Sequence, residues 1–354
     1  MKKINVLQVG SDIKVRGGIA TVINTYINYR WDDEITINYL ITHREGSIFD
    51  RLLCFIYALI KFPLILCKNK IQIVHIHMSE NGSFYRKYII LKLSKLFRKK
   101  AIIHMHGAVF HEFYDKSNPI TKNMIKNLLN QADQIIVLGE SWKEFVIKVM
   151  PTAKVKIAGN PVKINESYKN IDKVFNIIFI GFLEKRKGVD TLIKSIPYID
   201  AKNTDVKIWI CGDGPERENL EQLSHSLNVD DKVKFLGWID SKKKNEILKD
   251  ANVLVFPSQN EGLPMAILES LSYGIPVITT NVGSISDVIR DGYNGYFIEV
   301  GDFKRISEYI NGLLLNKSSY ILLSNNAIKI IENFYEEEKY FCKIKMLYRS
   351  LLIG

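Results

Sequence analysis

The chain has 354 residues, of which 47% are hydrophobic and 25% are charged. This is the composition of an ordinary globular protein that is long enough for two domains, each with its own core. It contains no short-period repeat and no low-complexity tract. The first residues are too short and too interrupted for a signal peptide, and the four cysteines lack metal-binding spacing. We therefore expect a cytosolic protein with reduced cysteines.

The net charge of +11 is unevenly distributed. Residues 1–165 hold 25 basic and 12 acidic residues, whereas residues 166–354 hold 24 and 26. The basic residues are densest in residues 51–100, where 11 of them accompany one acidic residue, Glu80. Such a region attracts lipid headgroups, nucleic acid or a phosphorylated substrate, and charge alone does not choose among these partners.

The first half of the chain alternates apolar, strand-like segments with helical ones. The expected strands are residues 4–9, 35–41, 71–76, 101–106, 134–138 and 155–158. This alternation predicts a parallel sheet covered by helices on both faces. A polar stretch, residues 163–173, then interrupts the pattern and is interpreted as an interdomain linker.

The same pattern resumes in the second half. Its expected strands are residues 174–181, 206–211, 232–236, 253–256 and 276–279. Residues 336–352 form an expected amphipathic helix. Two successive doubly wound units predict a ligand site beyond the carboxyl ends of their strands.

Two segments of the first half have membrane-binding character. Residues 52–67 are strongly apolar but fewer than the roughly 20 residues of a spanning helix, and they include Lys61 and Pro63. They are interpreted as a buried or interfacial helix. Residues 84–100 mix aromatic and aliphatic side chains with many cations, which suits either a helix on an anionic leaflet or an ordinary crossover helix.

The segment most informative about chemistry is residues 256–280, which reads FPSQNEGLPMAILESLSYGIPVITT. We expect a strand, a polar loop and a helix whose first residue is Pro264. Free backbone N–H groups at such a helix start favour phosphate binding, and they belong to Gly262, Leu263 and Met265. Glu261 and Glu269 supply carboxylates that can accept hydrogen bonds from sugar or ribose hydroxyls.

These two glutamates, separated by seven residues within EGLPMAILE, resemble the paired-glutamate motif of glycosyltransferase family 4. The resemblance extends through IFIGFLEKRKGVDTLIKSI, WICGDGPERENLEQL and GSISDVIRDGYNGYFIEVGD, and so covers nearly all of the second half. It implies the GT-B fold, an α/β architecture of two doubly wound, Rossmann-like domains facing a central cleft. The expected parts are an acceptor-binding domain at residues 1–165, a nucleotide-sugar-binding domain at residues 166–335, and a C-terminal helix at residues 336–354 that packs back toward the first domain.

The resemblance also implies roles for residues outside the glutamate motif. Gly17 and Gly18, after the first strand, match the family's glycine pair and allow close approach of a diphosphate. His106 matches a histidine beside the transferred sugar. Lys187 matches the lysine that faces the leaving diphosphate. Gly212 and Asp213 form the expected turn near the nucleotide base.

The sequence departs from the family pattern at Phe182, where the family often has arginine. We hypothesise that Arg186 supplies the second cation. The resemblance therefore assigns catalysis to His106, Glu261 and Lys187. It assigns donor binding to Gly17, Gly18, Arg186, Lys187, Gly212, Asp213, Glu261, Gly262, Leu263, Pro264 and Glu269.

The resulting expectation is a retaining hexosyltransferase that needs no metal and no cofactor. It would move a hexosyl or N-acetylhexosaminyl unit from a UDP- or GDP-sugar to a glycan or lipid-linked acceptor in surface polysaccharide synthesis. We expect it at the cytoplasmic face of the cell membrane, bound peripherally to anionic lipid, and not on nucleic acid. The alternatives are another nucleotide-sugar enzyme of the same fold, such as an epimerase, or a non-catalytic protein with a basic binding surface.

Overall fold

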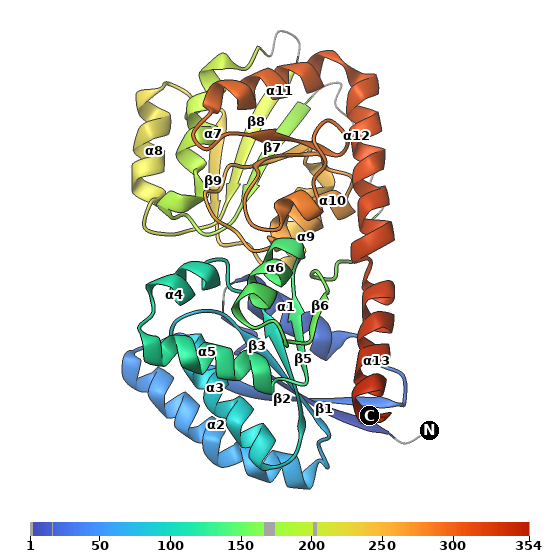
Figure 1. Ribbon diagram of the computed structural model, residues 1–354. Helices are drawn as coiled ribbons and strands as arrows, with labels where there is room; N and C mark the ends of the chain where they lie inside the picture. Colours follow the sequence, from blue (N-terminus) through green and yellow to red (C-terminus); the bar gives the residue numbers. More distant parts are fainter. Residues whose placement is uncertain (1–2, 16, 166–173, 201–203, 354) are drawn as a thin grey trace. The chain divides into compact units, whose positions relative to one another are not determined.

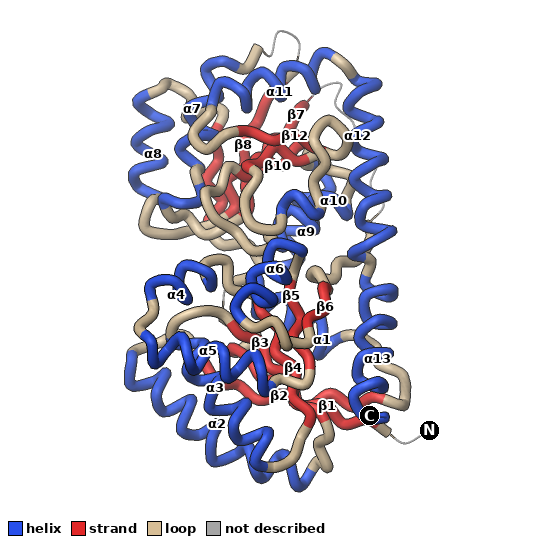
Figure 2. The backbone as a smooth tube through the Cα atoms, in the orientation of Figure 1, coloured by secondary structure: helices blue, strands red, loops and turns tan. Residues whose placement is uncertain are grey.

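The computed structural model describes residues 3–15, 17–165, 174–200 and 204–353. The chain forms two compact units, which are described separately (Figures 1 and 2). Unit 1 comprises Met1–Pro161 and Glu338–Gly354, and unit 2 comprises Val162–Glu337. Among the described residues, no helix is both long and apolar enough to cross a bilayer.

Unit 1 is built on a parallel sheet of six strands in the order β2-β1-β3-β4-β5-β6. The strands are β1 (Ile4–Ser11), β2 (Ile35–His43), β3 (Ile73–Met78), β4 (Lys100–Met105), β5 (Gln134–Val137) and β6 (Val155–Ile157). The helices are α1 (Gly18–Asn28), α2 (Ile48–Lys68), α3 (Gly82–Leu96), α4 (Phe110–Lys116), α5 (Pro119–Gln131), α6 (Glu140–Val149) and the C-terminal α13 (Glu337–Ile353). All six expected strands of this half are present. The inner strands β1, β3, β4 and β5 are mainly buried, whereas the edge strands β2 and β6 are partly exposed.

Unit 2 repeats the design with the strand order β12-β11-β10-β7-β8-β9, again all parallel. The strands are β7 (Val174–Ile180), β8 (Asp205–Cys211), β9 (Val233–Gly237), β10 (Val253–Phe256), β11 (Val277–Thr280) and β12 (Gly295–Ile298). The helices are α7 (Val189–Ser195), α8 (Arg217–Ser226), α9 (Ser241–Asp250), α10 (Met265–Ser272), α11 (Phe303–Leu315) and α12 (Lys317–Ile330). Strand β12 was not expected, because its segment is short, is not a long apolar run, and lies among glycines and turn residues.

The border between the units is defined by backbone hydrogen bonds. The Val162 N–H donates to the Tyr335 carbonyl at 3.0 Å, and the Asn165 N–H donates to the Ser272 carbonyl at 2.9 Å. Residues 162–165 therefore belong to unit 2, a few residues before the expected border at residue 166. Of the expected linker at residues 163–173, residues 166–173 lie outside the described part of the chain.

Helix α13 completes the core of unit 1. The Tyr340 hydroxyl lies 2.6 Å from the Tyr26 hydroxyl of α1. Tyr348 is fully buried and receives a hydrogen bond from the Gln8 amide of β1 at 3.0 Å. The last helix of the chain thus contributes buried aromatic side chains to the unit that the first strand begins.

Candidate active site

The most polar cluster of unit 2 lies where its sheet changes direction. Chain order runs one way from β7 to β9 and the other way from β10 to β12, so β7 and β10 are neighbours at the switch point. Ligands of open α/β sheets bind beyond the carboxyl ends of the strands at such a point. The loops that follow β7 and β10 carry Lys187 and Glu261, which places both residues at this position.

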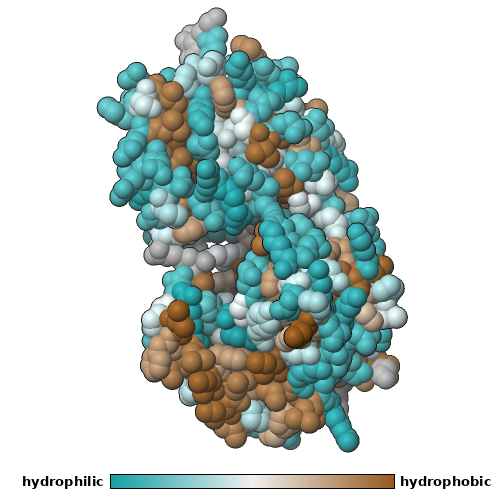
Figure 3. Space-filling model, turned by 60° about the vertical axis from the view of Figure 1, so that its left-hand side comes forward, coloured by the Kyte–Doolittle hydropathy of each residue, from teal (hydrophilic) through white to brown (hydrophobic). Residues whose placement is uncertain are grey.

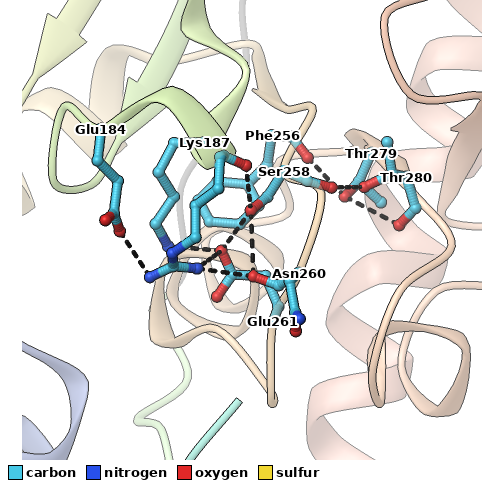
Figure 4. A network of polar contacts seen from close by, with 9 residues as sticks. Glu184, Lys187, Phe256, Ser258, Asn260, Glu261, Thr279 and Thr280 are labelled. Carbon is cyan, nitrogen blue, oxygen red and sulfur yellow. Dashed lines mark hydrogen bonds and ion pairs between the residues drawn. The ribbon is translucent and has the colours of Figure 1, made fainter. Parts of the chain in front are cut away.

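Glu261 is the centre of the cluster (Figure 4). Its Oε1 atom accepts hydrogen bonds from the Lys187 ammonium at 2.5 Å and from the Ser258 hydroxyl at 2.6 Å. The Lys187 and Glu261 side chains are only 11% and 8% exposed, so this is a largely buried ion pair. The Lys187 ammonium also lies 5.1 Å from the centre of the Phe256 ring. Ser258 was not predicted from the sequence, although it stands three residues before Glu261.

Arg186 brings a second cation to the same carboxylate. Its guanidinium lies 3.7 Å from Glu261 Oε1, donates to the Asn260 carbonyl at 2.7 Å and pairs with Glu184 at 2.6 Å. The side chain is 39% exposed. Two cations therefore converge on Glu261 without an arginine at position 182.

Phe182 has a different environment. Its ring stacks on Trp238 with the ring centres 6.2 Å apart and the planes 19° apart, and both side chains are partly exposed. The two residues follow β7 and β9, the strands on either side of β8. Gly212, which follows β8, was the expected turn near the base. An exposed aromatic pair thus borders that turn, a feature that the sequence reasoning did not identify.

The turn at Gly212 is fixed by close backbone approach. A β-carbon on Gly212 would lie 1.7 Å from the Gly181 carbonyl oxygen, so only glycine fits there. The Asp213 carbonyl accepts a hydrogen bond from the Leu183 N–H at 2.9 Å. The β8 turn is therefore held against the loop that leads from β7 to Lys187.

The helix after Glu261 begins one residue later than expected. Pro264 has an extended ψ of 129° and is the N-cap, and α10 begins at Met265. Leu263 is buried, and the Gly262 carbonyl accepts a hydrogen bond from the Ser284 N–H at 2.9 Å. The correction has a simple cause: Pro264 accepts the first helical hydrogen bond through its carbonyl, from the Leu268 N–H at 3.4 Å, without itself adopting the helical conformation.

Glu269 has its own cation. Its Oε1 atom accepts from the Lys244 ammonium of α9 at 2.6 Å, and the two side chains are 16% and 21% exposed. Lys244 was not predicted, because it lies in a lysine-rich surface helix where the sequence gives no sign of a specific partner.

The remaining predicted residues belong to unit 1. Gly18 begins α1, and Gly17 is its N-cap, with a φ of 141° that favours glycine. Apart from its chain neighbours, no atom of the described residues lies within 4 Å of the position where a β-carbon on Gly17 would stand. His106 directly follows β4. The two glycines and the histidine thus follow strands β1 and β4 of one sheet.

His106 is linked to the sheet interior by a directional chain of hydrogen bonds. His106 Nε2 lies 2.9 Å from His77 Nδ1, and His77 Nε2 lies 2.8 Å from the Gln8 amide oxygen. Burial lowers the pKa of His106 to about 3, so its ring is neutral at physiological pH. Burial likewise lowers the pKa of His77, and a neutral imidazole has one donor and one acceptor. Because the Gln8 oxygen can only accept, His77 donates through Nε2 and accepts through Nδ1. His106 must then donate through Nε2, which leaves its Nδ1 as a hydrogen-bond acceptor.

A parallel chain runs through His75 and His104. The Tyr348 hydroxyl lies 2.7 Å from His75 Nδ1, and His75 Nε2 lies 3.3 Å from His104 Nδ1. Ring nitrogens of His75, His77 and His104 lie within 4.8 Å of one another, a spacing that could hold a metal ion. Several of these nitrogens already bond to each other, to Gln8 or to Tyr348, so a metal would have to replace those bonds. The hydrogen-bonded arrangement accounts for their proximity.

Comparison with known proteins identifies the class of enzyme. Residues 163–330 match the family model of glycosyl transferases group 1. The chain is 27% identical over 335 residues to an uncharacterised 41.2 kDa protein of the Klebsiella pneumoniae cps region, covering 87% of this chain and 89% of that protein. It is 27% identical over 319 residues to an Escherichia coli UDP-Gal:alpha-D-GlcNAc-diphosphoundecaprenol alpha-1,3-galactosyltransferase, covering 84% and 80% of the two chains.

The fold has close counterparts among solved structures. The structure of Anabaena Alr3699/HepE in complex with UDP superposes with a TM-score of 0.79 at 16% sequence identity, covering 98% of this chain and all of that one. The expected fold is thereby confirmed. The chain is a glycosyltransferase of the GT-B fold.

Proposed function

We propose that this glycosyltransferase transfers a hexosyl or N-acetylhexosaminyl unit from a UDP- or GDP-sugar, with retention of configuration and without a metal ion. The acceptor is a glycan or a lipid-linked saccharide of surface polysaccharide synthesis. The observation that carries the proposal is the convergence of Lys187, Arg186 and Ser258 on Glu261 at the switch point of unit 2. The Escherichia coli relative named for a UDP-sugar and a diphosphoundecaprenol-linked acceptor supports the substrate classes.

The chemistry requires negative charge to be stabilised on the departing nucleoside diphosphate. Lys187 and Arg186 supply two positioned cations, and the start of α10 supplies backbone N–H groups. Lys187, whose side chain is only 11% exposed, acts more strongly there than it would in water. These groups stabilise the negative charge that a bound metal ion stabilises in other enzymes.

The carboxylates have holding roles in this proposal. Glu261 accepts from hydroxyls of the transferred sugar, and Glu269 from hydroxyls of the ribose. The acceptor oxygen attacks the anomeric carbon from the side on which the diphosphate leaves, and a departing phosphate oxygen takes its proton. The paired-carboxylate scheme of glycoside hydrolases therefore does not apply to Glu261 and Glu269.

His106 contributes through its Nδ1 acceptor. A neutral ring that donates through Nε2 to His77 presents a lone pair to a sugar hydroxyl rather than a positive charge to a phosphate. This geometry favours contact with a sugar hydroxyl over contact with the leaving phosphate.

A thermal-shift screen against nucleotides and nucleotide sugars, with and without EDTA, tests the donor site. A ligand that binds only the folded state raises the melting temperature. We expect one nucleotide class to stabilise the protein regardless of EDTA, and Lys187→Ala and Glu269→Ala to abolish the shift. Lys194→Ala removes an exposed ion pair with Asp190 and is the matched control, with the shift retained. If no nucleotide shifts the transition, or if EDTA removes the shift, the proposal is wrong.

The stereochemistry is tested separately by NMR of the product formed with the identified donor. A newly formed linkage with the anomeric configuration of the donor supports retention. An inverted linkage refutes it while leaving the transferase activity intact.

A further inference from the structure

Helix α2 packs on unit 1 through a stripe of buried residues that is flanked by the partly buried Phe55, Leu59 and Ile65. Cys54, Ala58, Phe62 and Leu66 recur every four residues and are all buried. The last three belong to the main hydrophobic core of the unit. This stripe accounts for the attachment of α2 to the sheet.

The opposite side of α2 is also apolar, and it is exposed. Ile56, Ile60 and Leu64 lie midway in sequence between the buried residues, and two residues correspond to about 200° of helical rotation. Ile60 and Leu64 are 62% and 64% exposed. The full set, here called the α2 face, is Ile48, Phe49, Leu52, Leu53, Ile56, Tyr57, Ile60 and Leu64.

A helix that is hydrophobic all round is normally covered all round. Figure 3 shows a broad hydrophobic band on the unit 1 part of the surface. A large contiguous apolar surface of this kind marks an interaction site rather than ordinary surface. The helix has 21 residues and is about 30 Å long, and the α2 face, from Ile48 to Leu64, covers about 24 Å of it.

The adjoining helix extends the same surface. Crossovers between parallel strands are right-handed, so α2 and α3, which lead from β2 to β3 and from β3 to β4, cover the same face of the sheet. Tyr85, Ile89 and Leu96 of α3 are exposed. However, α3 itself is anchored by Lys87, which is fully buried and donates to Thr42. The more exposed apolar surface is that of α2, the expected buried or interfacial helix, and not the basic segment 84–100, for which the sequence left a leaflet helix and an ordinary crossover helix open.

Exposed cations accompany the α2 face. Arg51, Lys61 and Lys68 of α2 are exposed, as is Arg98 just beyond α3. The acidic residues of this region are Asp50, which is exposed in the first turn of α2, and Glu80, so cations outnumber anions here. Exposed apolar side chains with a cationic border fit the interface of an anionic bilayer. A second copy of this chain would bring the same positive charge to the contact, and nucleic acid would leave the apolar side chains without a matching surface.

We propose that the α2 face docks on an anionic lipid bilayer, with the helix axis parallel to the membrane plane and the apolar side chains inserted among the acyl chains. The proposal deepens the proposed function, because it identifies the surface by which the enzyme would reach a lipid-linked acceptor. The docking itself involves only unit 1 residues outside the donor site.

Vesicle flotation of the full chain tests this docking. The probes are vesicles of phosphatidylcholine alone and of phosphatidylcholine mixed with phosphatidylglycerol. We expect binding to the mixed vesicles that weakens as salt is raised. The variant Ile56→Gln/Ile60→Gln/Leu64→Gln keeps good helix formers on solvent-facing positions and should lower partitioning roughly a hundredfold. The control Leu315→Gln/Leu322→Gln removes two equally exposed apolar side chains from unit 2 and should leave partitioning unchanged.

A second variant tests the charge separately. Lys61→Glu/Lys68→Glu changes the charge by four units, so it should lower partitioning to the mixed vesicles roughly a thousandfold at low salt and hardly change partitioning to phosphatidylcholine. It leaves the apolar side chains in place, so it remains informative if the triple variant fails to fold. The nucleotide-induced thermal shift, measured on each variant, reports the donor site independently of the membrane.

The outcomes separate the two proposals. Absence of vesicle binding by the wild-type chain, with the nucleotide shift intact, overturns the docking alone. A triple variant that partitions like the wild type also overturns it. If the wild-type chain is a dimer in solution and the triple variant is a monomer, the α2 face is a contact between two copies, and this contradicts membrane docking. Loss of the nucleotide shift with docking intact would instead refute the proposed donor site.

Discussion

The buried pair of Lys187 and Glu261 allows stability and catalysis to be separated. The variants are Lys187→Met, Glu261→Gln and the double variant. Removing one partner of a buried pair leaves an uncompensated charge and costs about 3–5 kcal/mol. Here Ser258 and Arg186 still face Glu261 after loss of the lysine, at 2.6 and 3.7 Å. We therefore expect Lys187→Met to lower the free energy of unfolding by about 2–3 kcal/mol.

The double variant carries no unpaired charge at the site. Its loss should be smaller than the sum of the two single losses by about 2 kcal/mol, within the range found for residues in contact. Hydrogen exchange of peptides from β7 and β10 measures the opening of unit 2 by itself. The same cycle on the exposed pair Lys194 and Asp190 should give a coupling below about 1 kcal/mol. A coupling for Lys187 and Glu261 as small as that control would refute the reasoning.

Turnover should behave differently from stability in the same variants. Loss of one positioned electrostatic group typically costs about a hundredfold to a thousandfold in turnover. The double variant has no unpaired charge at the site but still lacks the cation, so its turnover should remain at least as low as that of Lys187→Met. Recovery of turnover in the double variant would mean that Lys187 serves only to neutralise Glu261.

Three further predictions concern other parts of the site. Gln8→Met removes the acceptor that fixes the ring proton of His106, so turnover should fall about tenfold and the ¹⁵N shifts of the His106 ring should change; unchanged shifts would contradict the tautomer assignment. Acid should destabilise unit 1, because burial lowers the pKa of His75 and of His106 to about 3 from 6.5. Between pH 6.5 and 3 the unfolded chain binds more protons than the folded one, so each ring removes up to about 1.4 kcal/mol per pH unit as pH falls, measurable by urea unfolding. The variant His75→Gln should flatten that dependence, whereas His225→Gln on the surface should not. Trp238→Ala should weaken nucleotide binding about tenfold by calorimetry if the exposed ring stacks on the base, and unchanged affinity would exclude that contact.

Most of the strand pattern could be predicted from the sequence because parallel strands are buried on both faces. Strand β10 is a continuous apolar run, and β3 is apolar apart from His75 and His77, so the positions of both strands follow from the local pattern. Strand β12 lacks such a run and was missed. The start of α2 was placed late, although Ser47 and Asp50 form a capping box that marks it in the sequence.

The sequence by itself determined the class of fold and the positions of the motif residues, because both depend on local patterns: apolar runs, a proline before a helix, and two glutamates at a fixed spacing. Only the tertiary structure decided which side chains meet. Lys187 and Glu261 are 74 residues apart, and Gln8 and Tyr348 are 340 apart. Their contacts depend on strand order and helix packing, which no local pattern encodes. The exposure of the α2 face also depends on helix packing. When a helix is apolar on all sides, its sequence does not indicate which side the core will cover.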